Sequence, residues 1–116
     1  MSLPQQSALM RIYTDESARA GHKSLFEMIV CKARDAGIAG ATVLRGPMGF
    51  GHTHRIQNAS ILNLSGNLPL VIEIVDEESK LRGFLSNIES FKDIGLVTLE
   101  KVEILHRGAL DSSGEG

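Results

Sequence analysis

The stretch Leu70-Val-Ile-Glu-Ile-Val75 decides the fold of this chain. It is apolar at every position except Glu73, so a strand formed here presents apolar side chains on both of its faces, as central strands do. Leu70, Ile72 and Ile74 lie on one face of that strand, and the two valines lie on the other. We interpret Glu73 as a structural carboxylate at a subunit interface rather than as a catalytic base.

Patterns on both sides of this stretch give the order strand, helix, strand, strand, helix, strand. The expected elements are a strand over 9–14, a loop over 15–23, a helix from a Ser24–Glu27 capping box to Ala36, a strand over 41–44, the central strand over 70–75, a helix opened by an Asp76 N-cap, and a strand over 97–105. Residues 56–64 fit either a short strand or an ordered arm, and a change of apolar parity predicts a bulge at residues 100–101. This order predicts an α+β fold, the ferredoxin-like βαββαβ arrangement, with an antiparallel sheet and two helices on one face.

Two helices cover only one face of such a sheet. Because the central strand carries apolar side chains on both faces, the second face needs a cover of its own. Self-association is the simplest cover, so we expect a homo-oligomer. A ligand site at the seam between subunits follows, where the loop after the second strand leaves the sheet.

The composition is that of a globular chain with a single domain. Of 116 residues, 42% are hydrophobic and 22% are charged, and the net charge is −2. This balance argues against nucleic-acid binding, which needs a broad basic face. We expect the domain to span residues 8–107, with flexible tails at 1–7 and 108–116. The lone Cys31 cannot form an internal disulfide, which favours the reducing cytoplasm, and no apolar run reaches the roughly 20 residues of a membrane span.

A glycine-rich, cationic stretch, Val43-Leu-Arg-Gly-Pro-Met-Gly-Phe-Gly-His-Thr-His-Arg55, follows the second strand. Its candidate ligand-binding residues are Arg45, Gly46, Gly49, Gly51 and Arg55. The glycines let the backbone take positive φ and approach a ligand closely. No Asp or Glu occurs from residue 36 to residue 72, so the sequence predicts an uncompensated cationic loop that suits a phosphate or another anion. The alternative is a surface loop that happens to be basic.

Two histidines of this stretch, His52 and His54, suggest a second kind of site. Alternate residues of an extended segment face the same side, so the pair suits a Zn or Cu ion, with symmetry-related copies completing the ligand set. Metal binding or metal tolerance is therefore the alternative function. No Ser-His-Asp spacing, catalytic carboxylate pair or Cys-His motif stands out, so we expect no enzymatic activity.

Several blocks of the chain together resemble a known family. The blocks are Arg11-Ile-Tyr13, Leu25-Phe-Glu-x-Ile-Val30, Ala39-Gly-Ala-Thr-Val-Leu-Arg-Gly-x-Met-Gly-Phe-Gly51, Leu68-Pro-Leu-Val-Ile-Glu-Ile-Val-Asp76 and Gly95-Leu-Val-Thr-Leu-Glu100. They resemble the bacterial and archaeal domain-of-unknown-function family one-ninety, which is related in fold to the PII nitrogen-regulatory signalling proteins. The resemblance implies a homotrimer with small ligands in clefts between subunits and a loop after the second strand that reports ligand state. It also implies a link to ion transport, with a membrane transporter or channel as partner.

The chain departs from the signalling PII pattern in two places. The loop from Gly46 to Asn67 has no tyrosine, so tyrosine nucleotidylation is not available. Only Lys92-Asp-Ile-Gly95 stands where those proteins carry a longer glycine-rich phosphate loop. Our leading hypothesis is a trimeric, cytoplasmic PII-like regulatory protein that binds a small anionic ligand, such as ATP, ADP, AMP or another nucleotide, and reports it through the 46–67 loop. The further alternative is a structural interaction subunit with no ligand.

Overall fold

The computed structural model describes residues 6–51, 54–58 and 67–108. Its strands are β1 (Ser7–Asp15), β2 (Arg19–Ala20), β3 (Lys23–Ser24), β4 (Gly40–Arg45), β5 (Met48–Gly49), β6 (Gln57–Asn58), β7 (Pro69–Glu77) and β8 (Val97–Val102). Its helices are α1 (Leu25–Asp35) and α2 (Glu78–Ile88). The long elements, β1, α1, β4, β7, α2 and β8, occur in the predicted order. The predicted flexible tails fall almost entirely outside the described residues, as do residues 59–64 of the ambiguous stretch.

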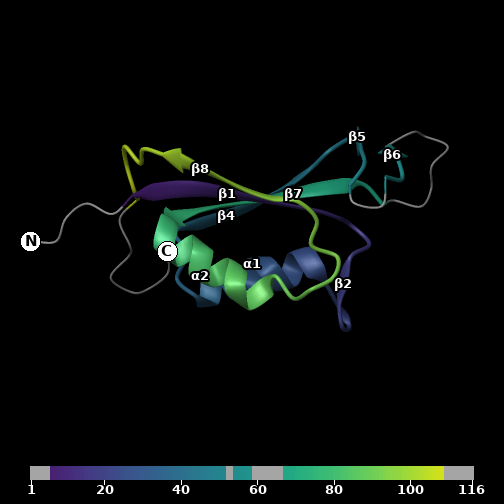
Figure 1. The fold of residues 1–116 in the computed structure, drawn as a ribbon, viewed down its shortest axis with the longest axis horizontal. Helices are drawn as coiled ribbons and strands as arrows, with labels where there is room; N and C mark the ends of the chain where they lie inside the picture. Colours follow the sequence, from purple (N-terminus) through teal and green to yellow (C-terminus); the bar gives the residue numbers. More distant parts are fainter. Residues whose placement is uncertain (1–5, 52–53, 59–66, 109–116) are drawn as a thin grey trace, which may run out of the picture.

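The long strands form one antiparallel sheet in the order β4-β7-β1-β8. Strands β7 and β1 are the central pair, in register from Ser7 opposite Glu77 to Asp15 opposite Pro69. This confirms the prediction of a central strand over 70–75. Both helices lie on one side of the sheet (Figure 1), so the predicted ferredoxin-like arrangement is confirmed.

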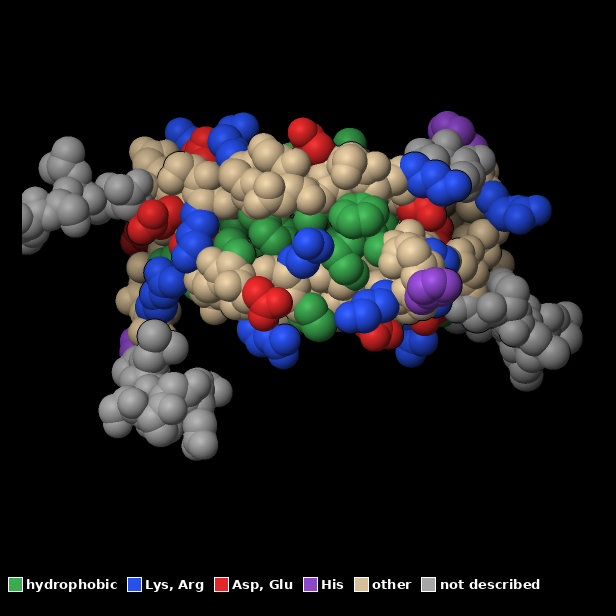
Figure 2. Space-filling model, turned by 90° about the horizontal axis from the view of Figure 1, so that it is seen from below, with side chains coloured by type: hydrophobic (Ala, Val, Ile, Leu, Met, Phe, Trp, Pro, Cys, Tyr) green, Lys and Arg blue, Asp and Glu red, His purple; other side chains and the backbone are tan. Residues whose placement is uncertain are grey.

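The hydrophobic core lies between the sheet and the helices. Alternate side chains of the central strands are buried there, because successive residues of a strand point to opposite faces. The largest buried apolar side chains at its centre are Met10, Ile12, Ile72 and Ile74 from the sheet and Leu25, Ile29, Leu81 and Ile88 from the helices. Figure 2 looks onto the helical side and shows hydrophobic side chains in a central band, with charged side chains around them. No helix in the described ranges is long and apolar enough to span a membrane.

Helix α1 begins after Ser24, but the predicted capping box is wrong. The Ser24 side chain makes no cap hydrogen bond. Its backbone is instead held by the short hairpin of β2 and β3, which occupies part of the predicted 15–23 loop. The Leu25 N–H donates to the carbonyl of Ala18 at 2.8 Å, so tertiary contacts satisfy the start of the helix. The helix ends as predicted, with Gly37 at a φ of +75°.

Asp76 is not the N-cap of the second helix, because it lies within β7 and Glu77 is the N-cap of α2. The strand register places its side chain on the helix-facing side of the sheet, where it is 2% exposed. One carboxylate oxygen accepts the Ala39 N–H at 2.8 Å, and the other accepts the Glu77 N–H at 2.7 Å. The Lys80 ammonium and the Arg107 guanidinium lie 3.6 Å and 3.8 Å from this carboxylate. Asp76 therefore joins the α1–β4 turn, α2 and the segment after β8.

Strand β8 contains no bulge. Its register with β1 is unbroken from Val97 opposite Ile12 to Val102 opposite Ser7. The strand ends at Val102, so Ile104 lies beyond it. Val102 is still within the strand but lies on the face opposite Val97 and Leu99, so the parity change needs no bulge, and the predicted bulge at residues 100–101 is wrong.

Within the described residues, no helix covers the other face of the sheet, which mixes charged and apolar side chains. Arg11 Nε lies 3.0 Å from Glu73, and Arg11 Nη1 lies 2.7 Å from Glu100. The hydrogen bond to Glu73, followed by the one to Glu100, raises the pKa of Arg11 above its ordinary value, so this arginine stays charged. On the same face the half-buried Val71 lies opposite Leu44, which is 48% exposed. Glu73 thus has a structural ion-pair partner, and apolar surface remains beside it.

Candidate functional site

The 46–67 loop leaves the sheet after β4 and returns at the start of β7 (Figure 1). Its described part includes a short antiparallel ribbon, in which β5 pairs with β6. Positive φ occurs among the described glycines only at Gly21 and Gly37, neither of which lies in this loop. The expectation that the loop glycines take positive φ is therefore wrong for Gly46, Gly49 and Gly51.

Gly46 and Gly49 serve instead to bring the loop close to Pro69. The Gly46 N–H donates to the carbonyl of Pro69 at 2.9 Å. A Cβ added at Gly46 would lie 3.3 Å from Pro69 Cγ, and one added at Gly49 would lie 3.2 Å from it. Both distances are shorter than the roughly 3.5–4.0 Å of an optimal carbon–carbon contact. A larger residue at either position would push the first part of the loop away from β7.

Beyond β5, a backbone hydrogen bond joins Gly51 and His54. The His54 N–H donates to the Gly51 carbonyl at 2.8 Å, and His54 takes a φ of +59°, which is uncommon for a residue with a Cβ. Its ring packs against Phe50, with the ring centroids 5.6 Å apart. His52 lies outside the described residues. Among the residues that are described, no group of three or more His, Cys, Asp or Glu side chains is placed to hold a metal ion.

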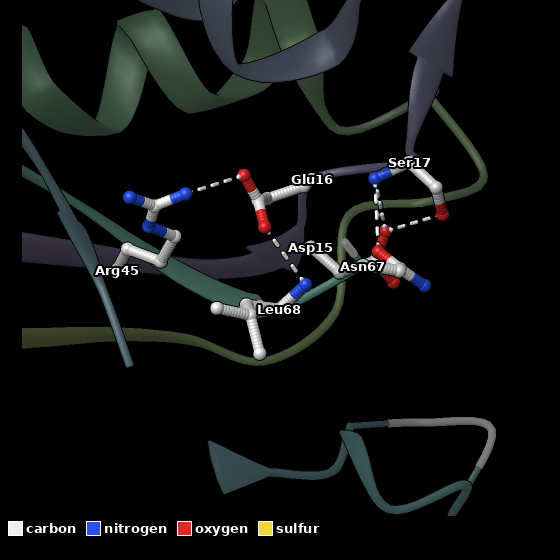
Figure 3. Close-up of polar contacts among 6 residues, drawn as sticks. All are labelled: Asp15, Glu16, Ser17, Arg45, Asn67 and Leu68. Carbon is white, nitrogen blue, oxygen red and sulfur yellow. Dashed lines mark hydrogen bonds and ion pairs between the residues drawn. The ribbon is translucent and has the colours of Figure 1, made fainter. Parts of the chain in front are cut away.

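Glu16, the residue after β1, joins the two ends of the loop (Figure 3). One carboxylate oxygen lies 3.2 Å from the Arg45 guanidinium, and the other accepts the Leu68 N–H at 3.0 Å. Beside it, the Ser17 N–H donates to the side-chain oxygen of Asn67 at 3.0 Å. The expectation of an uncompensated cationic loop is therefore wrong for Arg45, because its acid comes from a segment 29 residues earlier in the chain.

A cavity of about 600 Å³ lies between the 46–67 loop and the sheet. Its walls are Tyr13, Thr14, Asp15, Pro69, Leu70, Gly95 and Leu96 from the sheet and its flanks, and Gly49, Phe50, Gly51, Arg55 and Gln57 from the loop. Backbone hydrogen bonds of 2.9 Å hold the sheet side in place, from the Tyr13 N–H to the Leu96 carbonyl and from the Gly95 N–H to the Tyr13 carbonyl. The volume falls within the roughly 300–1,000 Å³ that small-molecule sites usually occupy.

The structure brings together part of the predicted site. Gly49, Gly51 and Arg55 line the cavity. Arg45 and Gly46 are not among its lining residues, because Arg45 is held by Glu16 and Gly46 is bonded to the start of β7. The structure therefore separates the loop residues into a group that faces the cavity and a group that anchors the loop.

The aromatic and apolar wall of the cavity is not predicted from the sequence. Tyr13 is 36% exposed, Phe50 is 62% exposed and Leu96 is 66% exposed, although all three have large apolar side chains. Phe50 could have been identified from its place within the glycine-rich stretch. Tyr13 and Leu96 meet only through pairing between distant segments, for which the local pattern carries no signal.

A second, polar depression of about 410 Å³ adjoins the cavity. It shares Asp15, Arg55 and Gln57 with the cavity. Its other lining residues are Ser17, Ala18, Asn67 and Asp93. The two spaces therefore share part of their walls, and the second space also reaches Asp93.

The antiparallel sheet with two helices on one face, and the loop that leaves it over a cavity, form a PII-like, ferredoxin-like fold. The fold is similar to that of CPII, a nitrogen regulatory PII-like protein from Thiomonas intermedia K12, in its structure bound to ADP, AMP and bicarbonate. The TM-score is 0.64 at 15% sequence identity, over 84% of this chain and 87% of that chain. CPII bound to ADP and bicarbonate gives a TM-score of 0.62 at 17% identity.

The chain belongs to the DUF190 family, described as "Uncharacterized ACR, COG1993", whose model matches residues 7–104. It is 39% identical over 98 residues to a UPF0166 protein of Aquifex aeolicus, spanning 84% of this chain and 92% of that relative. It is also 30% identical over 95 residues to UPF0166 protein MJ1524 of Methanocaldococcus jannaschii, spanning 81% of this chain and 87% of that relative. The predicted family membership is confirmed.

Proposed function

We propose that this chain is the protomer of a homotrimeric, cytoplasmic PII-like regulatory protein that binds a small anionic ligand, a nucleotide, beneath the 46–67 loop. The cavity supports this proposal most directly, because its walls come from both the sheet and the loop. A ligand in the cavity contacts both the sheet and the loop, so its affinity differs between one conformation of the loop and another. The loop position then reports whether ligand is present.

The uncovered face of the sheet supports self-association. It carries Leu44 and Val71 beside the Arg11 cluster, and both edge strands, β4 and β8, have an outer side with no strand partner in the described protomer. Tyr13 projects from the same face as Arg11, because the two are separated by one residue on β1. The cavity therefore lies at the rim of that face, where a neighbouring subunit would complete the site.

The cavity walls suit an anion attached to a flat ring. The Arg55 guanidinium offers parallel donors that match two oxygens of a phosphate or carboxylate. Gly49 and Gly51 leave backbone close to a ligand, and the Tyr13 and Phe50 rings offer surfaces for a base. The ADP and AMP in the CPII structures are ligands of this kind. We extend that ligand class to this chain, with a membrane transporter or channel as the regulated partner and with binding rather than catalysis as its activity.

Native mass spectrometry and calorimetric titration together test the proposal. We expect a trimer, and heat on titration with at least one of AMP, ADP and ATP. Arg55→Gln should weaken binding by about tenfold or more, because a hydrogen bond to a charged group contributes roughly 1.5–3 kcal/mol. Arg34→Gln is the matched control, since Arg34 lies 77% exposed on α1.

Two results would contradict the proposal. A monomer at micromolar concentration would contradict the self-association inferred from the uncovered face of the sheet. If no nucleotide gives heat on titration and none changes the melting temperature, the proposed nucleotide binding is contradicted. The reporting role is tested separately by hydrogen exchange of residues 46–51 and 54–58. Their protection should rise on ligand binding, and unchanged protection would contradict the reporting role.

A further inference from the structure

The pairing between β1 and β7 continues one step past the strands, through a bond that depends on a side chain. Glu16 and Leu68 follow the opposed pair of Asp15 and Pro69. The Glu16 N–H donates to the Leu68 carbonyl at 3.0 Å, as in a regular ladder. A hydrogen-bonded antiparallel pair normally exchanges two backbone bonds, but here the Leu68 N–H donates to Glu16 Oε1 at 3.0 Å. This last step of the pairing therefore depends on the carboxylate of residue 16.

The other oxygen of the same carboxylate contacts the opposite stem of the 46–67 loop. Glu16 Oε2 lies 3.2 Å from Arg45 Nη1, and the N–H of the next residue, Gly46, donates to the Pro69 carbonyl at 2.9 Å. The carboxylate thus contacts the residue before the loop, Arg45, and the residue after it, Leu68 (Figure 3). Because both oxygens belong to one rigid group, loss of either contact frees the group that makes the other.

The Glu16 contacts lie on the helical side of the sheet. Arg45 is opposite Leu70, which is 3% exposed, and directly opposed residues share a face. Thr14 is also opposite Leu70, and Glu16 follows two residues later, so its side chain points to the same side. The face on which we expect self-association is the other one. The contacts of Glu16 therefore do not need a neighbouring subunit.

Both contacts border residues that line the cavity. Asp15 precedes Glu16, Pro69 follows Leu68, and both Asp15 and Pro69 line the cavity from the sheet. A shift of either stem therefore moves part of the cavity wall. Glu16 is not among the lining residues, so any effect of Glu16 on the site passes through these neighbours.

We propose that Glu16 is a positioning residue for the ligand site, whose carboxylate couples the two stems of the 46–67 loop so that they hold or release the cavity wall together. The inference rests on the function proposed above and adds to it a residue that does not touch the ligand. The Arg45 contact is the weaker of the two, because Arg45 is 62% exposed and exposed ion pairs contribute little.

A double-mutant cycle, read by hydrogen exchange of the Leu68 amide in the full chain, tests the coupling. Arg45→Met removes a partner of Glu16 without changing either group of the Leu68 bond, yet it should speed this exchange by about twofold or more. In a Glu16→Gln background the same substitution should have no effect, because the ion pair is already absent. Arg82→Met is the matched control, since Arg82 and Glu78 are 64% and 26% exposed, against 62% and 25% for Arg45 and Glu16.

Two outcomes of the cycle overturn the inference, whether or not a nucleotide binds. One is a Leu68 amide that exchanges at the same rate in the wild type and in folded Arg45→Met. The other is an equal response to Arg45→Met in both backgrounds, which would show that the effect does not pass through the Glu16 carboxylate.

Calorimetric titration with AMP, ADP and ATP tests the effect on the site. We expect Glu16→Ala to weaken binding of the tightest of the three by about threefold or more, because fewer molecules hold the binding-competent wall. Glu16→Gln should weaken it less, and the matched Glu78→Ala should leave it unchanged. A purely structural role would lower the melting temperature of Glu16→Ala but leave the affinity of the folded protein unchanged, and that result overturns the positioning role.

Failure of the inference and failure of the proposed function remain distinguishable. If the wild type binds a nucleotide and Glu16→Ala binds it equally well, only the positioning role is overturned. If the wild type binds none of the three, the proposed function is contradicted and the positioning role falls with it. Should Glu16→Ala not fold, Arg45→Met provides the same comparison, with Arg82→Met as its control.

Discussion

Asp76→Ala should cost this domain a large part of its stability. The substitution leaves the N–H groups of Ala39 and Glu77 without the carboxylate oxygens that now lie 2.8 and 2.7 Å away. A buried donor left unsatisfied costs about 1–3 kcal/mol, and water can reach the more exposed Ala39 side, so we expect a total loss of about 2–4 kcal/mol. Lys80 and Arg107 add little, because both are substantially exposed.

Urea denaturation followed by circular dichroism measures this loss. With an m-value of about 2 kcal/mol/M, the unfolding midpoint of Asp76→Ala should fall by about 1–2 M. Asp76→Asn retains one side-chain oxygen as an acceptor and should unfold between the wild type and the alanine variant. Asp35→Ala removes a carboxylate that is 72% exposed and should stay within about 0.5 kcal/mol of the wild type. Equal midpoints for Asp76→Ala and Asp35→Ala would refute the role assigned to the buried carboxylate.

Two further predictions concern the 46–67 loop. Glu16→Ala should speed hydrogen exchange of the Leu68 amide by about fivefold or more, because the amide loses an acceptor worth about 1 kcal/mol or more. Glu16→Gln keeps a side-chain oxygen and should speed this exchange less. Equal exchange rates in the wild type and both variants would contradict the role of Glu16 in holding Leu68. The second prediction compares metal uptake by the wild type and by a variant with both His52 and His54 replaced by alanine, in equilibrium dialysis against zinc and copper. We expect equal uptake, because the described residues supply no group of three metal ligands. Greater uptake by the wild type would favour the metal-binding alternative.

The parts of this fold that could be predicted from sequence are those with local periodicity. The nearly continuous apolar run around Ile72 predicts a central strand, and the spacing of Leu81 and Ile88 marks the inner face of α2. Such patterns depend only on which side of an element faces the core. They therefore predict the element order, and the order restricts the sheet to few arrangements.

The parts that could not be predicted depend on pairing between distant segments. Asp76 has the chemistry of an N-cap, but the register of β7 with β1 makes it a buried acceptor for Ala39 instead. Arg45 appears unpaired within an acid-free interval, yet the end of β1 brings Glu16 to it. In both cases the residue type is informative, and the partner is set by tertiary structure.

The end of β1 connects the cavity to the ends of the 46–67 loop. Tyr13 and Asp15 line the cavity, and the next residue, Glu16, bonds to Arg45 and Leu68 on the two sides of the loop. In the function proposed above, a ligand that shifts Tyr13 or Asp15 would act on a backbone held by the Gly95 N–H and continuous with Glu16, and we expect the displacement to reach both loop ends. Because these contacts involve β1 and the two ends of the loop, the proposed reporting role does not need the described helices to move.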